Sequence, residues 1–388
     1  MLYRGGGEAL PDARPHATAV LSKASGAAGR GGAARRGSWR RWPLPGLPVG
    51  VVAVFLALWL AGCATGNPQS TIDPKGPFAR HIYDLFVTWI FWPAVAVFVI
   101  VEGLLLYAVW RFRGREGDPL PAQIHGNTRL EITWTLIPAI ILIVILFFTF
   151  RTQAVLATPP PGDAITVRVI GHQWWWEFEY PDYGFTTANE MHIPVGVPVI
   201  IQLESADVIH SFWVPHLAGK TDAIPGRINR IWLQADEPGV YSGQCAEFCG
   251  IQHALMRLLV IAEPRSEFER WARNERSIPI ATAPTPTPAP GTPESLVSQG
   301  AQLFATGACV TCHTVRGTPA QGKVGPELTH FGSRRTIAAN TLPKDEKGEN
   351  LKRWLRNPQA VKPGALMPNL NLSEQDVEAL AAYLQSLK

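Results

Sequence analysis

Apolar residues gather in three runs within the first 150 positions of the chain, at 49–60, 89–110 and 132–150. The second run holds one charge, Glu102, and the third holds none. Each of these two runs matches the roughly 20 residues that a helix needs to cross a bilayer. The pattern therefore predicts two transmembrane helices joined by a short loop.

The loop between these helices is basic, because Arg111, Arg113, Arg115 and Arg129 lie in it or at its edges. Positively charged loops of membrane proteins remain on the cytoplasmic side. We therefore expect a helical hairpin whose two outer ends face the outside of the cell.

The first apolar run follows a basic segment, since eight Lys and Arg residues occur within residues 1–41. A charged segment, a short apolar run and small residues before the cleavage point are typical of a secretory signal. The run ends in Leu60-Ala61-Gly62-Cys63. This sequence resembles the lipobox of bacterial lipoproteins and predicts lipidation of Cys63. The alternative is an uncleaved membrane helix that ends in an incidental cysteine.

The pattern of apolar positions changes after residue 164. Short β-branched and aromatic runs, separated by proline and glycine, predict strands of an all-β sandwich or barrel. These runs are 165–170, 197–203, 230–234 and 258–261. Six prolines within residues 277–293 predict an extended spacer of up to ~50 Å. Helical patterns at 295–305 and 373–387 then predict a small all-α domain, with Ser373 as the cap of its last helix.

The net charge of the chain is +4, and no basic stripe or nucleic-acid motif accompanies it, which argues against a nucleic-acid partner. The charge is unevenly distributed, because residues 163–276 carry a net charge of −6 and residues 293–388 a net charge of +3. The sequence therefore predicts that these two segments attract each other. Salt screens such attraction beyond about 8–10 Å.

The last domain contains Cys309-Val310-Thr311-Cys312-His313. Two cysteines followed directly by a histidine form the attachment pattern of a c-type haem, with the histidine as iron ligand. Met367 is the one methionine of this domain and is the predicted sixth ligand, with His330 as the alternative. Ligation by His and Met raises the haem potential and suits electron transfer.

A second group of soft ligands comprises Cys245, Cys249, His253 and Met256. A disulfide would leave the histidine and the methionine without a role, and a zinc site has little use for a thioether. Thiolate, imidazole and thioether together favour copper, and two thiolates suggest two coppers bridged by sulfur. His210, upstream on a predicted strand, supplies the missing imidazole.

The residues around these ligands resemble subunit II of cytochrome c oxidase over about 83–271, including its periplasmic cupredoxin domain. The matching motifs are Gly171-His172-Gln173-Trp174-Trp175-Trp176, His210-Ser211-Phe212, the segment 220–227 and the ligand loop 245–256. The haem domain resembles class I cytochromes c and looks like the variant in which the oxidase carries its own cytochrome c. The resemblance implies a multidomain membrane protein with a transmembrane helical hairpin, an all-β cupredoxin domain and an all-α class I cytochrome c domain.

The resemblance also implies roles for individual residues. Cys245 and Cys249 would bridge the two ions of a dinuclear copper A centre. Its further ligands would be His210, His253, Met256 and the backbone carbonyl of Glu247.

Three side chains outside the copper ligand set gain roles from the same resemblance. Trp174 would be the aromatic residue through which electrons enter, and the Glu247 side chain would face a Mg site shared with subunit I. Glu131 would lie at the mouth of a proton channel, although an interfacial charge with no role is the alternative for it.

The predicted domains are a disordered region and signal peptide (1–62), an external linker (63–82), the transmembrane hairpin (83–155), the cupredoxin copper domain (160–272), a Pro-rich linker (273–293) and the cytochrome c domain (294–388). The predicted function is subunit II of a proton-pumping respiratory haem-copper cytochrome c oxidase. Electrons would pass from one covalent haem c to the copper pair and on to subunit I, where dioxygen is reduced.

The expected partners are subunit I, subunit III and a soluble or membrane-bound electron donor. The expected location is the bacterial inner membrane, crossed more than once, with the copper and haem domains on the periplasmic side. The equivalent subunit of a haem-copper nitric oxide reductase is the alternative function. A free membrane-anchored electron shuttle is disfavoured, because one lipid and one helix would suffice for it. A quinol oxidase subunit lacks the copper ligands.

Overall fold

The computed structural model describes residues 69–114, 122–279 and 293–388, together with positions 50, 53, 54, 57, 117 and 119. Most of the predicted signal peptide, Cys63 and most of the Pro-rich spacer lie outside the described residues. All elements described below belong to one unit, Ala64–Lys388.

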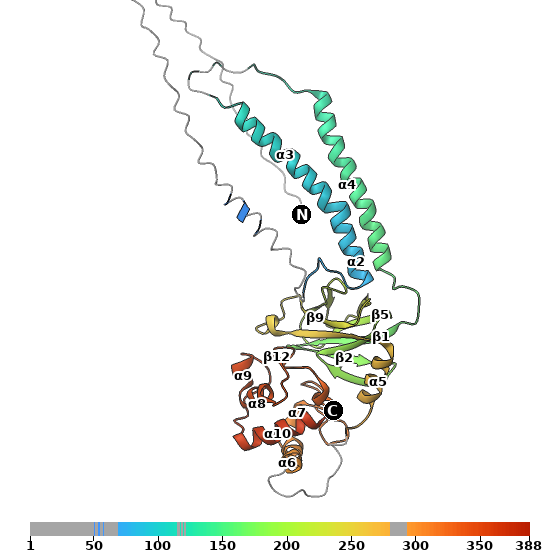
Figure 1. The fold of residues 1–388 in the computed structure, drawn as a ribbon, viewed down its shortest axis with the longest axis vertical. Coiled ribbons are helices and arrows are strands. Elements are labelled where there is room, and N and C mark those ends of the chain that lie inside the picture. Colours follow the sequence, from blue (N-terminus) through green and yellow to red (C-terminus); the bar gives the residue numbers. More distant parts are fainter. Residues whose placement is uncertain are drawn as a thin grey trace, which may run out of the picture. The chain divides into compact units, whose positions relative to one another are not determined.

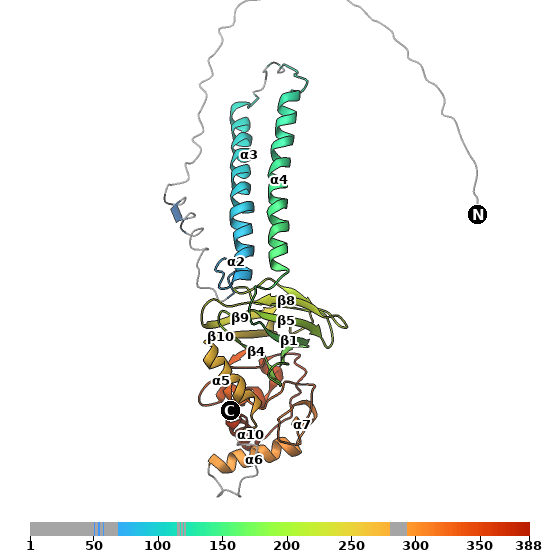
Figure 2. The same ribbon diagram turned by 90° about the vertical axis from the view of Figure 1, so that its right-hand side faces the viewer.

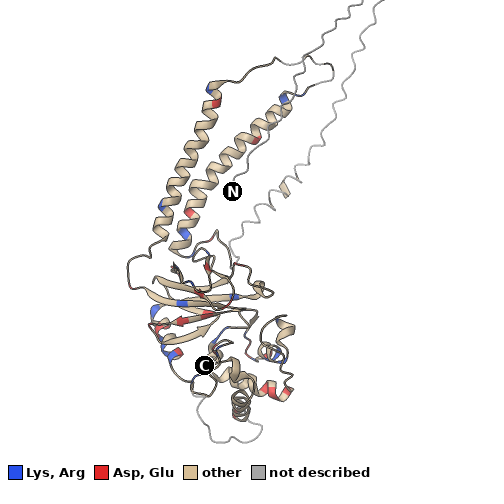
Figure 3. Cartoon of the chain, turned by 180° about the vertical axis from the view of Figure 1, so that it is seen from behind, with Lys and Arg blue, Asp and Glu red and all other residues tan. Residues whose placement is uncertain are grey.

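Two long helices form the predicted hairpin. The first is continuous through α2 (Pro77–Asp84), a π-helical stretch η1 (Leu85–Phe91) and α3 (Trp92–Arg111), and the second is α4 (Thr128–Leu156). The helices run side by side, and Trp89 stacks on Phe148 with ring centroids 3.4 Å apart (Figure 2). Few charged residues occur along them, and both are long and apolar enough to span a membrane (Figure 3). The predicted pair of transmembrane helices is confirmed.

The hairpin is joined to the β-domain at its outer end. The indole Nε1 of Trp232, on β8, donates to the carbonyl oxygen of Leu156 at 2.8 Å, and the Phe78 ring packs edge-on against the same indole. These contacts fix the last turn of α4 on the surface of the domain that follows it.

The β-domain consists of two five-stranded sheets, confirming the predicted all-β domain (Figure 1). One sheet has the order β3-β2-β1-β5-β8 and the other the order β4-β10-β9-β6-β7. Burial alternates along β1, as expected for a strand with one face in the core. The strands are β1 (Ile165–His172), β2 (Trp175–Tyr180), β3 (Phe185–Ala188), β4 (Glu190–Pro194), β5 (Val199–Ser205), β6 (His210–Trp213), β7 (Thr221–Ala223), β8 (Asn229–Leu233), β9 (Gly239–Cys245) and β10 (Arg257–Glu263).

Helix α5 (Arg265–Arg276) follows β10 and packs on β3, β4 and β10. The C-terminal domain then begins, and its largest contact joins α6 and α10. Ser373 caps α10 by accepting a hydrogen bond from the backbone N–H of Asp376, as predicted. The elements of this domain are α6 (Pro293–Thr306), α7 (Cys309–Cys312), η4 (Phe331–Ser333), β11 (Thr336–Ile337), β12 (Leu342–Pro343), α8 (Glu349–Arg356), α9 (Pro358–Val361) and α10 (Glu374–Ser386).

The β-domain and the C-terminal domain meet in a contact that excludes water. Ala339 of the C-terminal domain is buried against Trp175 and Ala188 of the sandwich. Beside it, the buried Glu190 carboxylate accepts hydrogen bonds from the backbone N–H groups of Arg335 and Thr336. The transmembrane hairpin and the C-terminal domain therefore both contact the β-sandwich.

Charged groups are also buried near the end of α5. Glu275 is 3% exposed and lies near Glu327, Arg316 and Arg334 of the C-terminal domain. The pKa of Glu275 is raised to about 7, mainly by burial and also by the nearby Glu327, while the two arginines partly offset the rise. This carboxyl is therefore poised to change its charge near neutral pH.

Candidate functional site

The predicted copper ligands come from two neighbouring strands and one loop. Strand β6 begins at His210, and β9 ends at Cys245; the two strands pair, with Phe212 opposite Cys245. The loop of residues 245–256, here called the copper loop, then turns back so that the Cys245 N–H donates to the carbonyl oxygen of Met256 at 2.9 Å. This hydrogen bond joins the first and last residues of the loop at the end of β9.

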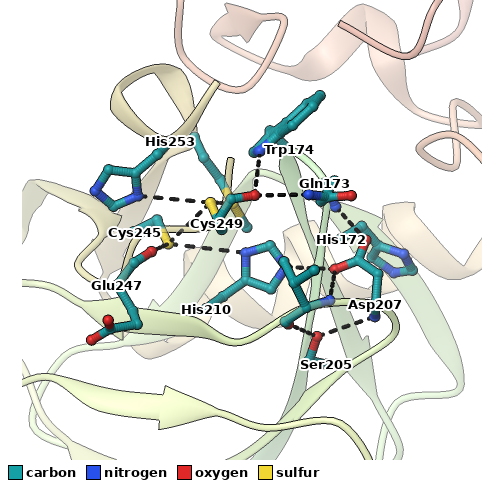
Figure 4. Close-up of polar contacts among 12 residues, drawn as sticks. His172, Gln173, Trp174, Ser205, Asp207, His210, Cys245, Glu247, Cys249 and His253 are labelled. Atoms are coloured by element: carbon teal, nitrogen blue, oxygen red, sulfur yellow. Dashed lines mark hydrogen bonds and ion pairs between the residues drawn. The ribbon is translucent and has the colours of Figure 1, made fainter. Parts of the chain in front are cut away.

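The two thiols lie between the imidazoles of His210 and His253 (Figure 4). The Sγ atoms of Cys245 and Cys249 are 3.7 Å apart. Cys245 Sγ lies 4.0 Å from His210 Nδ1 and 3.2 Å from the carbonyl oxygen of Glu247.

Cys249 Sγ completes the arrangement on the other side. It lies 3.7 Å from His253 Nδ1 and 3.8 Å from the Met256 sulfur. Each sulfur therefore has one imidazole and one further donor beside it, which is a pattern suited to two metal ions bridged by two sulfurs.

The thiols are electrostatically prepared for metal binding. The close contact with Cys249 lowers the pKa of the Cys245 thiol below its ordinary value, and the His210 ring contributes to the shift. The pKa of Cys249 is raised by the same neighbour and by burial. The contact thus favours the thiolate form of Cys245, and thiols that bind a metal do so as thiolates and release their protons. The donor set of thiolates, imidazoles and a thioether fits copper.

A carboxylate that sequence reasoning missed orients His210. Asp207 Oδ1 lies 2.7 Å from His210 Nε2, and the Asp207 carboxylate also accepts hydrogen bonds from the backbone N–H groups of Gln173 and Val208. A partner on the second ring nitrogen holds a metal-binding histidine in one tautomer and orientation. Gly171 leaves space for this ring, because a Cβ there would lie 2.7 Å from His210 Cδ2. The sequence feature that could have identified Asp207 is its position three residues before His210.

The predicted haem ligands line a cavity of about 250 Å³. Its wall includes Cys309, Cys312, His313 and Met367, and most of its other lining residues are apolar. The Nδ1 atom of His313 lies 2.8 Å from the carbonyl oxygen of Pro326, which leaves Nε2 for an iron. A Cβ at Gly325 would lie 2.6 Å from His313 Cε1, so glycine is required beneath this ring. The residues present therefore fit a covalently attached haem.

The alternative ligand His330 lies elsewhere. It is not part of the cavity wall, and its Nε2 bonds to the carbonyl oxygen of Ser277 at 3.1 Å. Its Nδ1 faces the side-chain amide of Asn274 at 3.5 Å. The geometry thus favours Met367 over His330.

Three sequence families match successive parts of the chain. Residues 73–152 match the transmembrane domain of cytochrome c oxidase subunit II, residues 184–263 match its periplasmic domain, and residues 297–388 match cytochrome c. Cytochrome c oxidase subunit 2 of Alkalihalophilus pseudofirmus is 43% identical over 341 residues, which cover 86% of this chain and 95% of that relative. The chain belongs to the cytochrome c oxidase subunit 2 family.

Two further relatives carry the same name. Cytochrome c oxidase subunit 2 of Bacillus sp. PS3 is 37% identical, covering 90% of this chain and 98% of the relative. The protein of that name from Bacillus subtilis is 35% identical, covering 87% and 97%. Because at least 86% of this chain is covered in each case, the similarity extends into the haem domain as well as the copper domain.

Within this family's architecture, Trp174 lies between the two candidate centres. Its Nε1 donates to the carbonyl oxygen of Cys249 at 2.9 Å, and Gln173 Nε2 donates to the same oxygen at 2.8 Å. The same Trp174 also forms part of the wall of the haem cavity. One indole therefore contacts both the copper loop and the space that a haem would fill.

The remaining predicted side chains lie apart from these centres. Glu131 is in the first turn of α4, where its Oε1 accepts a hydrogen bond from the N–H of the capping residue Asn127 at 3.2 Å. This contact gives Glu131 a structural role at the helix start, similar to that of a capping box. The carboxylate of Glu247 points away from the thiols and lies 3.8 Å from Lys220 Nζ, at the surface (Figure 4).

Proposed function

We propose that this chain is the electron-input subunit of a haem-copper oxidase that reduces dioxygen in subunit I. The observation that carries the proposal is the ligand geometry of the copper loop, with two sulfurs 3.7 Å apart and an imidazole beside each. When bound, a haem c and a copper pair each accept and release one electron at a time.

The copper residues have separate tasks in this proposal. Cys245 and Cys249 would supply the thiolates that hold two copper ions, and His210 and His253 would supply one imidazole each. Met256 and the carbonyl oxygen of Glu247 would complete the donor set. The sandwich holds these donors in place before metal arrives, because His210 lies on a strand and is fixed by Asp207.

The haem residues form the site at which electrons enter the chain in this proposal. Cys309 and Cys312 would attach one haem covalently, His313 would bind its iron, and Met367 would be the sixth ligand. The apolar wall of the cavity excludes water from the group that it holds. We propose Trp174 as the side chain through which the electron passes, since it lies between the cavity wall and Cys249.

The family's assembly supplies further proposals. Subunit III and a soluble or membrane-bound donor join the complex with subunit I, and the Glu247 carboxylate faces a Mg ion shared with subunit I. Glu131 lies at the mouth of a proton channel at the cytoplasmic start of α4. The complex spans a bacterial inner membrane with its copper and haem domains on the periplasmic side, and Cys63 is lipidated.

A pair of substitutions tests the two centres separately. In the purified complex, Cys245→Ser should abolish the near-infrared copper absorption and leave a covalently bound, reducible haem. Cys309→Ser should weaken covalent haem attachment and leave the copper absorption intact. The wild-type complex should reduce dioxygen much faster than nitric oxide. A near-infrared band that persists in Cys245→Ser, or faster reduction of nitric oxide, would contradict the proposal.

A further inference from the structure

The segment that leads to Met367, residues 362–367, reaches across to the sandwich and is here called the Met367 loop. It follows α9 and begins with Lys362, which is only 4% exposed. Lys362 Nζ donates to the backbone carbonyl oxygen of Trp174 at 2.8 Å. The ammonium group of Lys362, in the haem domain, thus forms a hydrogen bond to the backbone of the copper domain.

A second contact of the same loop involves a glycine. Gly364 has φ of +87°, and a Cβ at this position would lie 2.7 Å from Ile251 Cγ2. Ile251 belongs to the copper loop, between the proposed ligands Cys249 and His253. The absence of a side chain at residue 364 therefore allows the Met367 loop to approach the copper loop closely.

Together these contacts link the two proposed centres through few atoms. Lys362 precedes Met367 by five positions and holds the carbonyl of Trp174, while the indole of the same residue bonds to Cys249. A loop that carries a proposed haem ligand is thereby fixed to the residue that contacts a proposed copper ligand.

Burial of Lys362 is costly unless the contact is made. An ammonium out of water requires hydrogen-bonded partners, and burial lowers the pKa of Lys362 to about 8. The basic residues of the C-terminal domain include many at its surface, such as Lys347, where charge is fully hydrated. The burial of Lys362 in the contact between the domains therefore indicates that this lysine positions the two domains relative to each other.

We propose that Lys362 is a positioning residue for electron transfer, which holds the Met367 loop of the haem domain against Trp174. The inference rests on the proposed function, because it assigns a role to the contact between the two redox domains. Lys362 acts through Trp174 and the Met367 loop and does not itself bind a metal or haem.

The kinetic test uses the whole oxidase complex with Lys362→Met, Lys362→Arg and the surface control Lys347→Met. The haem is reduced rapidly with light, and copper reduction is followed in the near infrared. Lys362→Met should slow this internal transfer about tenfold, since one hydrogen bond to a charged group is lost. Lys362→Arg should recover most of the rate because it restores a cationic donor. Lys347→Met should match wild type.

The spectra of each variant separate this inference from the proposed function. If the visible haem bands and the near-infrared copper band are absent in the wild type, the proposed function fails. If both bands are intact and Lys362→Met transfers electrons at the wild-type rate, the positioning role is overturned. Equal slowing in Lys362→Met and Lys362→Arg would also overturn it.

A second measurement needs no electron transfer and no variant. In the full-length wild-type protein, an amine-reactive reagent should label Lys362 at least about tenfold more slowly than Lys347, because the docked domain covers it. Mass spectrometry of the labelled peptides gives both rates. Equal labelling of the two lysines would mean that the contact is not populated in solution, and the proposal would be wrong.

Discussion

Replacing Glu190 by glutamine should loosen the haem domain from the sandwich without changing either metal centre. Glu190 is 3% exposed and lies at the start of β4. Its Oε1 accepts from the backbone N–H and the hydroxyl of Thr336, both at 2.7 Å, and both carboxylate oxygens accept from the Arg335 N–H at 2.9 Å. A glutamine can keep one oxygen in place, but its NH₂ group would face an N–H donor.

The expected change in docking free energy follows from the hydrogen bond that Glu190→Gln loses. The variant forfeits one hydrogen bond to a charged acceptor, worth about 1.5–3 kcal/mol. The undocked state of the haem domain should therefore become roughly ten- to a hundredfold more populated, since each 1.4 kcal/mol is a factor of ten.

Hydrogen exchange of the full-length protein measures this population. Peptides that cover Arg335 and Thr336 should exchange roughly ten- to a hundredfold faster in Glu190→Gln than in wild type. Glu237→Gln, which removes an exposed carboxylate from the same domain, is the matched control and should leave exchange unchanged. Unchanged protection in Glu190→Gln would refute the reasoning that these hydrogen bonds hold the domains together.

Three further outcomes are expected. Asp207→Asn should reduce copper affinity about 10–100-fold, measured by competition with a chelator, because His210 loses the carboxylate that orients it. Met367→Ala should lower the haem potential in a redox titration, and an unchanged potential would direct attention to His330. The folded-state pKa of Glu275 is about 7, above its ordinary value of 4.5. Ionisation of Glu275 should therefore lower the stability by about 3 kcal/mol as pH rises from about 4.5 through 7, and Glu275→Gln should remove this contribution from the pH dependence of thermal unfolding.

Much of the fold could be predicted from the sequence because its signals are local. The apolar runs at 89–110 and 132–150 became the two membrane helices, although the first helix starts earlier, at Pro77, with a polar turn that apolar content does not reveal. The predicted strands appear in β1, β5, β8 and β10. Shorter strands such as β7 (Thr221–Ala223) were not predicted, because three residues carry no periodic pattern.

The ligand sets were recognisable for a related reason. The copper loop and the haem-attachment segment each place several ligands within a dozen residues, so their chemistry is visible as spacing. Asp207 and Lys362 were missed because neither belongs to such a cluster. Each acts through a fold-dependent contact, one on His210 and the other on a backbone carbonyl 188 positions away.

The contact between the two domains could not be predicted from the net charges of the segments. The opposite net charges of residues 163–276 and 293–388 predicted a general attraction between these two segments. Two of the buried contacts instead join a charged side chain to backbone groups: Glu190 to two N–H groups and Lys362 to a carbonyl. Backbone partners leave no trace in sequence, and buried contacts are screened little by salt. Docking of the haem domain should therefore depend on these two side chains far more than on net charge.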